Sequence, residues 1–61
     1  MAVEDLAEGI AASDTLIAVW YDDEAGEVLV QYGYVSISLP PEDFSDLIEL
    51  LLKAEERLER L

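Results

Sequence analysis

The side chains that could do chemistry in this chain are almost all carboxylates. The chain has 61 residues, of which 15 are Asp or Glu, and it has neither His nor Cys. It therefore offers no Ser-His or Cys-His nucleophile pair, and no imidazole or thiolate to bind zinc. Two carboxylates can catalyse hydrolysis, but they need a cleft that holds them at a controlled separation. So short a chain leaves little room for such a pocket, and we predict no enzyme, no catalytic residue and no cofactor.

The densest group of acids is the segment DDEAGE at residues 22–27. Hard cations prefer several oxygen ligands, which draws attention to this segment. It lacks the twelve-residue pattern of an EF-hand loop, however. We interpret it as the solvated tip of a β-hairpin and predict no metal site.

Charge is the most unusual feature of the composition. The only bases are Lys53, Arg57 and Arg60, and the net charge is −12. Binding to a nucleic acid backbone or to an anionic membrane depends on basic groups, so we predict neither partner. Adaptation to a salty cytoplasm is the leading explanation of the acidity, because salt screens the repulsion between carboxylates. An acidic surface without special purpose and a mimic of nucleic acid are the alternatives.

The pattern of residues predicts a single α+β domain over residues 1–61. Val3, Leu6, Ala7, Ile10 and Ala11 follow helical spacing, which predicts a short N-terminal helix over residues 3–12. Residues 15–21 are rich in β-branched and aromatic side chains, which is typical of a strand. Residues 28–32 and 34–39 continue either as one long strand or as two pieces hinged at Gly33. The fold is thus a β-hairpin, or three short strands, followed by a long C-terminal amphipathic helix.

The C-terminal helix is the most strongly indicated element. Pro41 suits the first helical turn, where Glu42 and Asp43 complement the helix dipole. Its apolar stripe, which also follows a heptad pattern, consists of Phe44, Leu47, Ile48, Leu51, Ala54, Leu58 and Leu61. Under three heptads do not by themselves establish a coiled coil, so we expect this stripe to pack on the chain's own sheet. Leu50 and Leu52 widen the apolar surface beyond the stripe.

The hairpin register decides which side chains share a face of the sheet. If Asp23 faces Glu27, then Trp20 lies opposite Val30 and Ala18 opposite Tyr32. The aromatic residues of that face could stack on nucleobases only within a basic surround, which the chain lacks. Trp and Tyr are enriched at subunit contacts, so we interpret the face as an interface. The predicted interface residues are Leu16, Ala18, Trp20, Val30, Tyr32, Tyr34, Leu50 and Leu52.

These observations predict a non-catalytic interaction or regulatory module. A domain this small is marginal as a monomer, and it has no disulfide or metal to stabilise it. We therefore expect a homodimer, with another protein as a further partner. No apolar run approaches the length of a membrane span, and the N-terminus lacks a basic region, which predicts a cytoplasmic protein. The alternative function is an acidic inhibitor that competes with nucleic acid for a basic protein.

Overall fold

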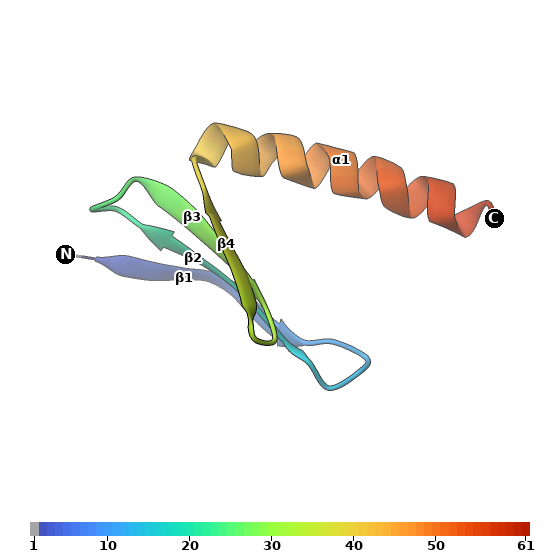
Figure 1. Cartoon of the computed structure of the whole chain (residues 1–61), viewed down its shortest axis with the longest axis horizontal. Helices are drawn as coiled ribbons and strands as arrows, with labels where there is room; N and C mark the ends of the chain where they lie inside the picture. The colour runs from blue at the N-terminus through green and yellow to red at the C-terminus, as the bar shows by residue number, and fades with distance from the viewer. Residues whose placement is uncertain (1) are drawn as a thin grey trace.

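The computed structural model describes residues 2–61, which form an antiparallel sheet followed by one helix (Figure 1). The sheet has four strands in the order β1-β2-β3-β4, so neighbours along the chain are neighbours in the sheet. The elements are β1 (Val3–Ile10), β2 (Leu16–Asp22), β3 (Glu27–Tyr32), β4 (Val35–Leu39) and α1 (Pro41–Glu59). The predicted α+β class with a long C-terminal helix is therefore confirmed, and Gly33 separates two distinct strands.

The predicted N-terminal helix over residues 3–12 is wrong, because this segment forms strand β1. Its register against β2 shifts between Asp5 and Ala7, which marks a β-bulge. Side chains alternate between faces along a strand, so Val3 and Ile10 would lie on opposite faces of a regular one. The shift brings them to the same face, opposite Asp22 and Leu16 respectively. The bulge thus brings residues seven apart to one face, a spacing that a helix also has, whereas Ala7 lies opposite Val19 on the other face.

The predicted register of the β2–β3 hairpin is wrong by one residue. Asp22 rather than Asp23 lies opposite Glu27, so Trp20 pairs with Leu29 and Val19 with Val30. The Asp22 side chain sets this loop, because its carboxylate accepts hydrogen bonds from the backbone N–H groups of Glu24 and Ala25 at 3.0 and 3.3 Å. The loop ends at Gly26, whose φ of 69° confirms the left-handed conformation expected of this glycine.

The observed register sorts the sheet into an apolar and a more polar face. The helix-side face, which α1 overlies, carries Glu4 together with Ala7, Gly9, Ile17, Val19, Tyr21, Val28, Val30, Tyr32, Val35, Ile37 and Leu39. The outer face carries Val3, Asp5, Glu8, Ile10, Leu16, Ala18, Trp20, Asp22, Glu27, Leu29, Gln31, Ser36 and Ser38. A hydrogen bond from the Ser38 hydroxyl to the Glu27 carboxylate, 2.6 Å long, crosses the outer face. The sheet therefore has the ordinary pattern of one apolar and one solvated face.

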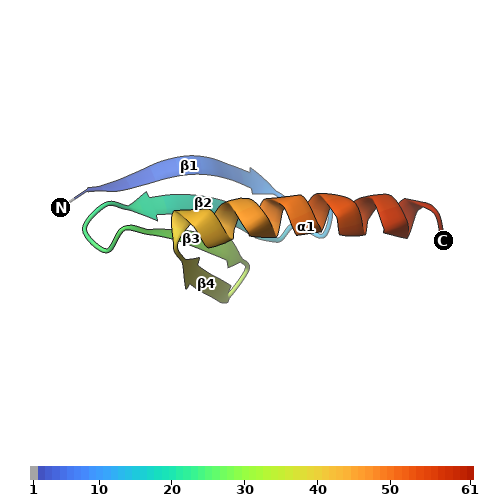
Figure 2. The same ribbon diagram turned by 90° about the horizontal axis from the view of Figure 1, so that it is seen from above.

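Helix α1 begins at Pro41, as predicted, and ends at Glu59. Two i, i+4 ion pairs lie along the helix, with Lys53 Nζ 3.7 Å from Glu49 and an Arg60 guanidinium nitrogen 3.3 Å from Glu56. Seen from above, the helix crosses over the sheet and continues beyond it (Figure 2). Seen from the side, it diverges from the strands after its first turns (Figure 1). The expected packing of the whole stripe on the chain's own sheet therefore does not occur.

A two-residue turn, Gly33-Tyr34, joins β3 to β4, with Gly33 at φ 60° in the position that glycine takes in type II′ turns. A Cβ added at Gly33 would lie 3.2 Å from Thr15 Cγ2, whereas one at Gly26, φ 69°, would meet nothing within 4 Å. We expect Gly33→Ala to lower the free energy of unfolding by about 2 kcal/mol, and Gly26→Ala by about 1 kcal/mol from backbone strain alone. Urea unfolding measures both changes.

Gly9 provides the matched control for these two variants. A Cβ there would also meet nothing within 4 Å, and Gly9 does not have a positive φ. Gly9→Ala should therefore leave the stability unchanged or raise it slightly, because alanine restricts the unfolded chain. Equal losses in all three variants would contradict the assigned turn geometry.

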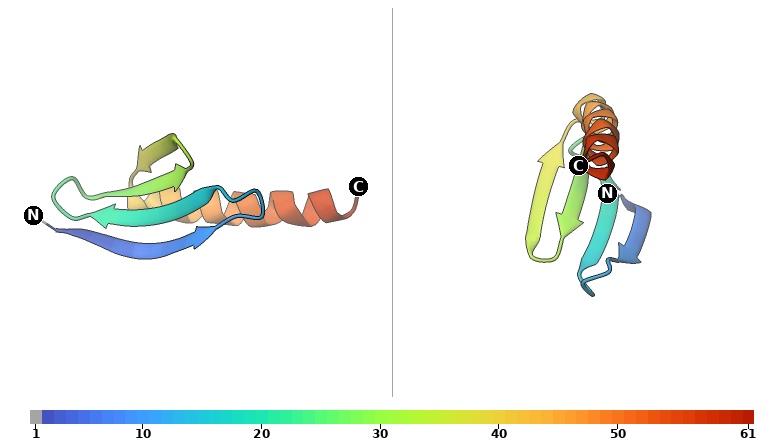
Figure 3. Two further views of the ribbon diagram at one scale, coloured as in Figure 1. Left: turned by 90° about the horizontal axis from the view of Figure 1, so that it is seen from below. Right: turned by 90° about the vertical axis from the view of Figure 1, so that its right-hand side faces the viewer.

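The folded chain is thin and has almost no interior. Among residues 2–61, only Ala18 and Val28 are buried, and none of the residues of α1 is. The radius of gyration is 13.0 Å, against about 10.5 Å for a compact domain of this length. The sheet and the diverging helix, seen end on in Figure 3, thus form an open two-layer arrangement.

Candidate self-association surface

The helix-side face of the sheet is apolar and only partly covered. The start of α1 covers Val28, where β4 leads into the helix, and Val28 is only 3% exposed. Farther from that junction, Ile17 is 39%, Ile37 48% and Val35 65% exposed. Exposed apolar surface of this extent is unusual on a soluble monomer. The free part of the face is therefore a candidate binding surface.

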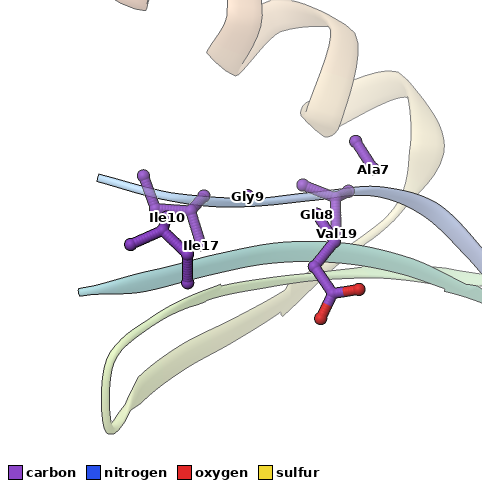
Figure 4. A pocket seen from close by; sticks show the side chains of 6 residues that line it. All are labelled: Ala7, Glu8, Gly9, Ile10, Ile17 and Val19. Atoms are coloured by element: carbon purple, nitrogen blue, oxygen red, sulfur yellow. The ribbon is translucent and has the colours of Figure 1, made fainter. Parts of the chain in front are cut away.

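A shallow hollow of about 270 Å³ marks this face where β1 and β2 lie side by side (Figure 4). Ala7 points from β1 toward the helix, whereas the carboxylate of Glu8 points to the opposite side (Figure 4). Ile10, Ile17 and Val19 also line the hollow. A mostly apolar and open depression can accept an apolar side chain but does not assemble groups for catalysis.

The second part of the surface is the apolar side of α1. Near the sheet, Leu47 and Leu50 face Ile37 and Leu39 across a groove of about 400 Å³. Beyond the sheet, the helix has no cover: Leu51 is 58%, Leu52 61% and Leu58 67% exposed. The apolar surface of the helix is thus continuous with the helix-side face through the groove.

The structure divides the predicted interface residues between four places. Leu16, Ala18 and Trp20 lie on the outer face, and Ala18 is buried there at 1% exposure. Val30 and Tyr32 lie on the helix-side face, and Tyr34 lies in the β3–β4 turn. Leu50 and Leu52, each 61% exposed, lie on the helix. The one-residue difference in register separates the aromatic residues that the predicted pairing brings together.

Sequence reasoning assigned Ile17, Val19 and Ile37 to the interior beneath the helix. They do lie on the face that the helix overlies, but Ile17 and Ile37 remain exposed because α1 diverges. The angle between helix and sheet depends on nonlocal packing, and no local pattern in the sequence reports it.

The hydroxyl of Tyr32 belongs to a small polar group at the end of the β1–β2 loop. Ser13 Oγ and Thr15 Oγ1 lie 2.8 Å apart, and both residues hydrogen-bond the phenol. These bonds lower the pKa of Tyr32, because hydroxyl donors stabilise the phenolate, and slight burial opposes the shift. The group anchors the loop to β3 and shows no nucleophile-base arrangement.

The carboxylates are spread over the molecule rather than gathered into a site. They lie on β1, at the β2–β3 loop and along α1. Within residues 2–61, no three acids lie close enough together to hold a metal ion. In the same range, no helix is long and apolar enough to cross a membrane.

The candidate surface therefore consists of apolar side chains contributed by β1 to β4 and by α1. The acids that line its hollows are Glu8 between β1 and β2, Asp43 and Asp46 between β4 and α1, and Glu55 on the helix. Comparison of the chain with protein-family models, curated proteins and solved structures found no match.

Proposed function

We propose that this protein is a non-catalytic interaction module that acts by associating first with itself and then with another protein. The observation that carries the proposal is the accessible surface. A compact monomer of 6.8 kDa exposes about 3,950 Å², roughly 1,000 Å² less than the 4973 Å² that this chain exposes. Large apolar side chains on the helix-side face and on α1 contribute to this exposed surface: Tyr32 is 54%, Leu50 61% and Leu52 61% exposed.

Self-association supplies the cover that these surfaces lack. A two-fold dimer needs only one self-complementary patch, so it is the simplest assembly that buries them. The helix-side face and the apolar side of α1 are poor in charge, so the carboxylates of two copies can stay in solvent. The acidity is consistent with a cytoplasm of high salt, where screening reduces repulsion between the copies.

The spread of the acids supports this function over inhibition by mimicry of nucleic acid. A mimic would need carboxylates along one ridge at intervals like those of phosphates. Here they occupy the edge strand β1, the β2–β3 loop and the whole length of α1. This arrangement suits a hydrated acidic surface on all sides of a dimer.

Light scattering in molar KCl tests the proposal. At high micromolar concentration, the wild type should have twice the mass of one chain, because the excess apolar surface favours pairing. Val19→Glu, which places a charge on the helix-side face, should shift the mass toward that of a monomer. A wild-type mass equal to one chain at this concentration would refute self-association.

A further inference from the structure

The apolar side of α1 is too wide for a single sheet to cover. Leu50 and Leu52 mark its margins, because residues two positions apart on a helix are separated by about 200° around the axis. The sheet of the same chain faces only the side of α1 near Leu47 and Leu50, across the groove to β4. The other side carries a hollow of about 330 Å³ lined by Ile48, Leu51, Leu52 and Glu55. This second side needs a partner that lies along the helix.

The spacing of the apolar residues matches a second helix. Phe44, Leu51 and Leu58 repeat at seven residues, as do Leu47, Ala54 and Leu61. This is the seam of a two-helix coiled coil, which a short helix can form when other contacts support it. The part of α1 beyond the sheet projects freely (Figure 3), so a second helix can lie against it there without displacing a strand. Near Leu47, which lines the groove to β4, the second helix lies beside the sheet.

The charges along α1 determine the direction of that second helix. The N-terminal half has only acids, Glu42, Asp43, Asp46 and Glu49, whereas all three bases follow Leu52. Lys53 and Arg60 are paired within the helix, but Arg57 has no ion-pair partner among residues 2–61. The C-terminal half also has three acids, Glu55, Glu56 and Glu59, so it is neutral overall. A parallel pair would bring the two acidic halves together, whereas an antiparallel pair places each acidic half beside a neutral half. Opposed helix dipoles favour the antiparallel direction as well.

From these observations we propose that α1 pairs antiparallel with α1 of a second copy across a two-fold axis. In this register, Leu47 lies against Leu58 of the second copy and Leu51 against its Ala54. Asp46 then lies level with Arg57 and Arg60 of the second copy, on the same flank of the seam. This inference rests on the proposed self-association and names the surface that performs it.

The available area is what a stable dimer needs. Removing the excess surface of roughly 1,000 Å² from each chain buries about 2,000 Å² in total, within the range of specific and lasting interfaces. The helix pair supplies the centre of this interface. The helix-side faces of the two sheets, still open beside it, supply the remainder.

Two substitutions to Glu, at positions of nearly equal exposure in the single chain, test the contact between the helices. Leu51 is 58% and Leu52 61% exposed, so an effect on the monomer alone would be the same for both. In the antiparallel pair, Leu51 lies at the centre and Leu52 at the margin. Sedimentation equilibrium in molar KCl should show that Leu51→Glu weakens the dimer at least about 100-fold, and Leu52→Glu less than about tenfold. Equal weakening would overturn the proposal.

Disulfide cross-linking tests whether the two helices run antiparallel, and it does not depend on the two substitutions to Glu. The chain has no native Cys, so only introduced thiols can react. When Leu47→Cys and Leu58→Cys variants of different tag length are mixed and oxidised, the antiparallel pair predicts a mixed dimer as the main product. A parallel pair predicts the two unmixed dimers, and that result would overturn the proposal.

The experiments separate the two proposals. A dimer that survives Leu51→Glu but dissociates with Val19→Glu would keep the proposed function and reject the helix pair. A wild type that is monomeric under the same conditions would reject both.

Discussion

The melting temperature of this protein is expected to rise by about 5 °C for each tenfold increase in protein concentration. Dilution is therefore expected to unfold it. The reason is that Ala18 and Val28 are the only buried residues in the range 2–61, so one copy lacks a core that could support the sheet. Most apolar burial must then come from association, which links the free energy of unfolding to concentration by mass action. Circular dichroism melts over two decades of concentration in molar KCl measure the effect.

The matched control for this experiment is Leu51→Glu, which is expected to weaken the dimer. Its melting temperature at high concentration should resemble that of the wild type at low concentration. A wild-type melting temperature that is independent of concentration would mean that one chain is stable by itself. The open helix-side face would then serve a different partner.

Salt is the second variable with a large expected effect. Raising KCl from dilute buffer to a molar concentration should increase the free energy of unfolding by roughly 2 kcal/mol. The melting temperature should rise by about 10 °C. The net charge is −12, and acids that are close neighbours, such as Asp22 and Asp23 in the β2–β3 loop, repel each other when unscreened. Circular dichroism across a salt series at one protein concentration measures the change.

Neutral substitutions on β1 test whether the salt effect comes from these charges. The acids Glu4, Asp5 and Glu8 lie on an exposed edge strand, so Glu4→Gln, Asp5→Asn and Glu8→Gln together should preserve the packing. The triple variant should be more stable in dilute buffer and less sensitive to salt. Equal stability of the wild type in dilute buffer and in molar salt would contradict adaptation to a salty cytoplasm.

The edges of the sheet show how the acids also limit unwanted association. The free edge of β1 carries three acids and a bulge, both of which discourage pairing with another strand. The edge strand β4 carries no charge, but Pro40 and Pro41 follow it directly and end it. Both features disfavour pairing through the edges of the sheet.

The sequence by itself determined α1 and the tips of the hairpins, because both depend on neighbouring residues. Pro41 with Glu42 and Asp43 begins the helix, and the ion pairs from Glu49 and Glu56 lie one turn away from their partners. The positive φ of Gly26 depends only on the conformational freedom of glycine itself. Such interactions lie within a few residues of the chain, where patterns of spacing report them directly.

Only the tertiary structure decided the conformation of residues 3–10, the β2–β3 register and the direction of α1. Strand β1 pairs with β2, and its bulge at Leu6 puts Val3 and Ile10, seven residues apart, on one face. The β2–β3 register differs by one residue from the predicted one, which places Val30 and Tyr32 on the helix-side face rather than beside Trp20. The divergence of α1 left that face open, because the packing of a helix on a sheet depends on contacts between residues far apart in the chain.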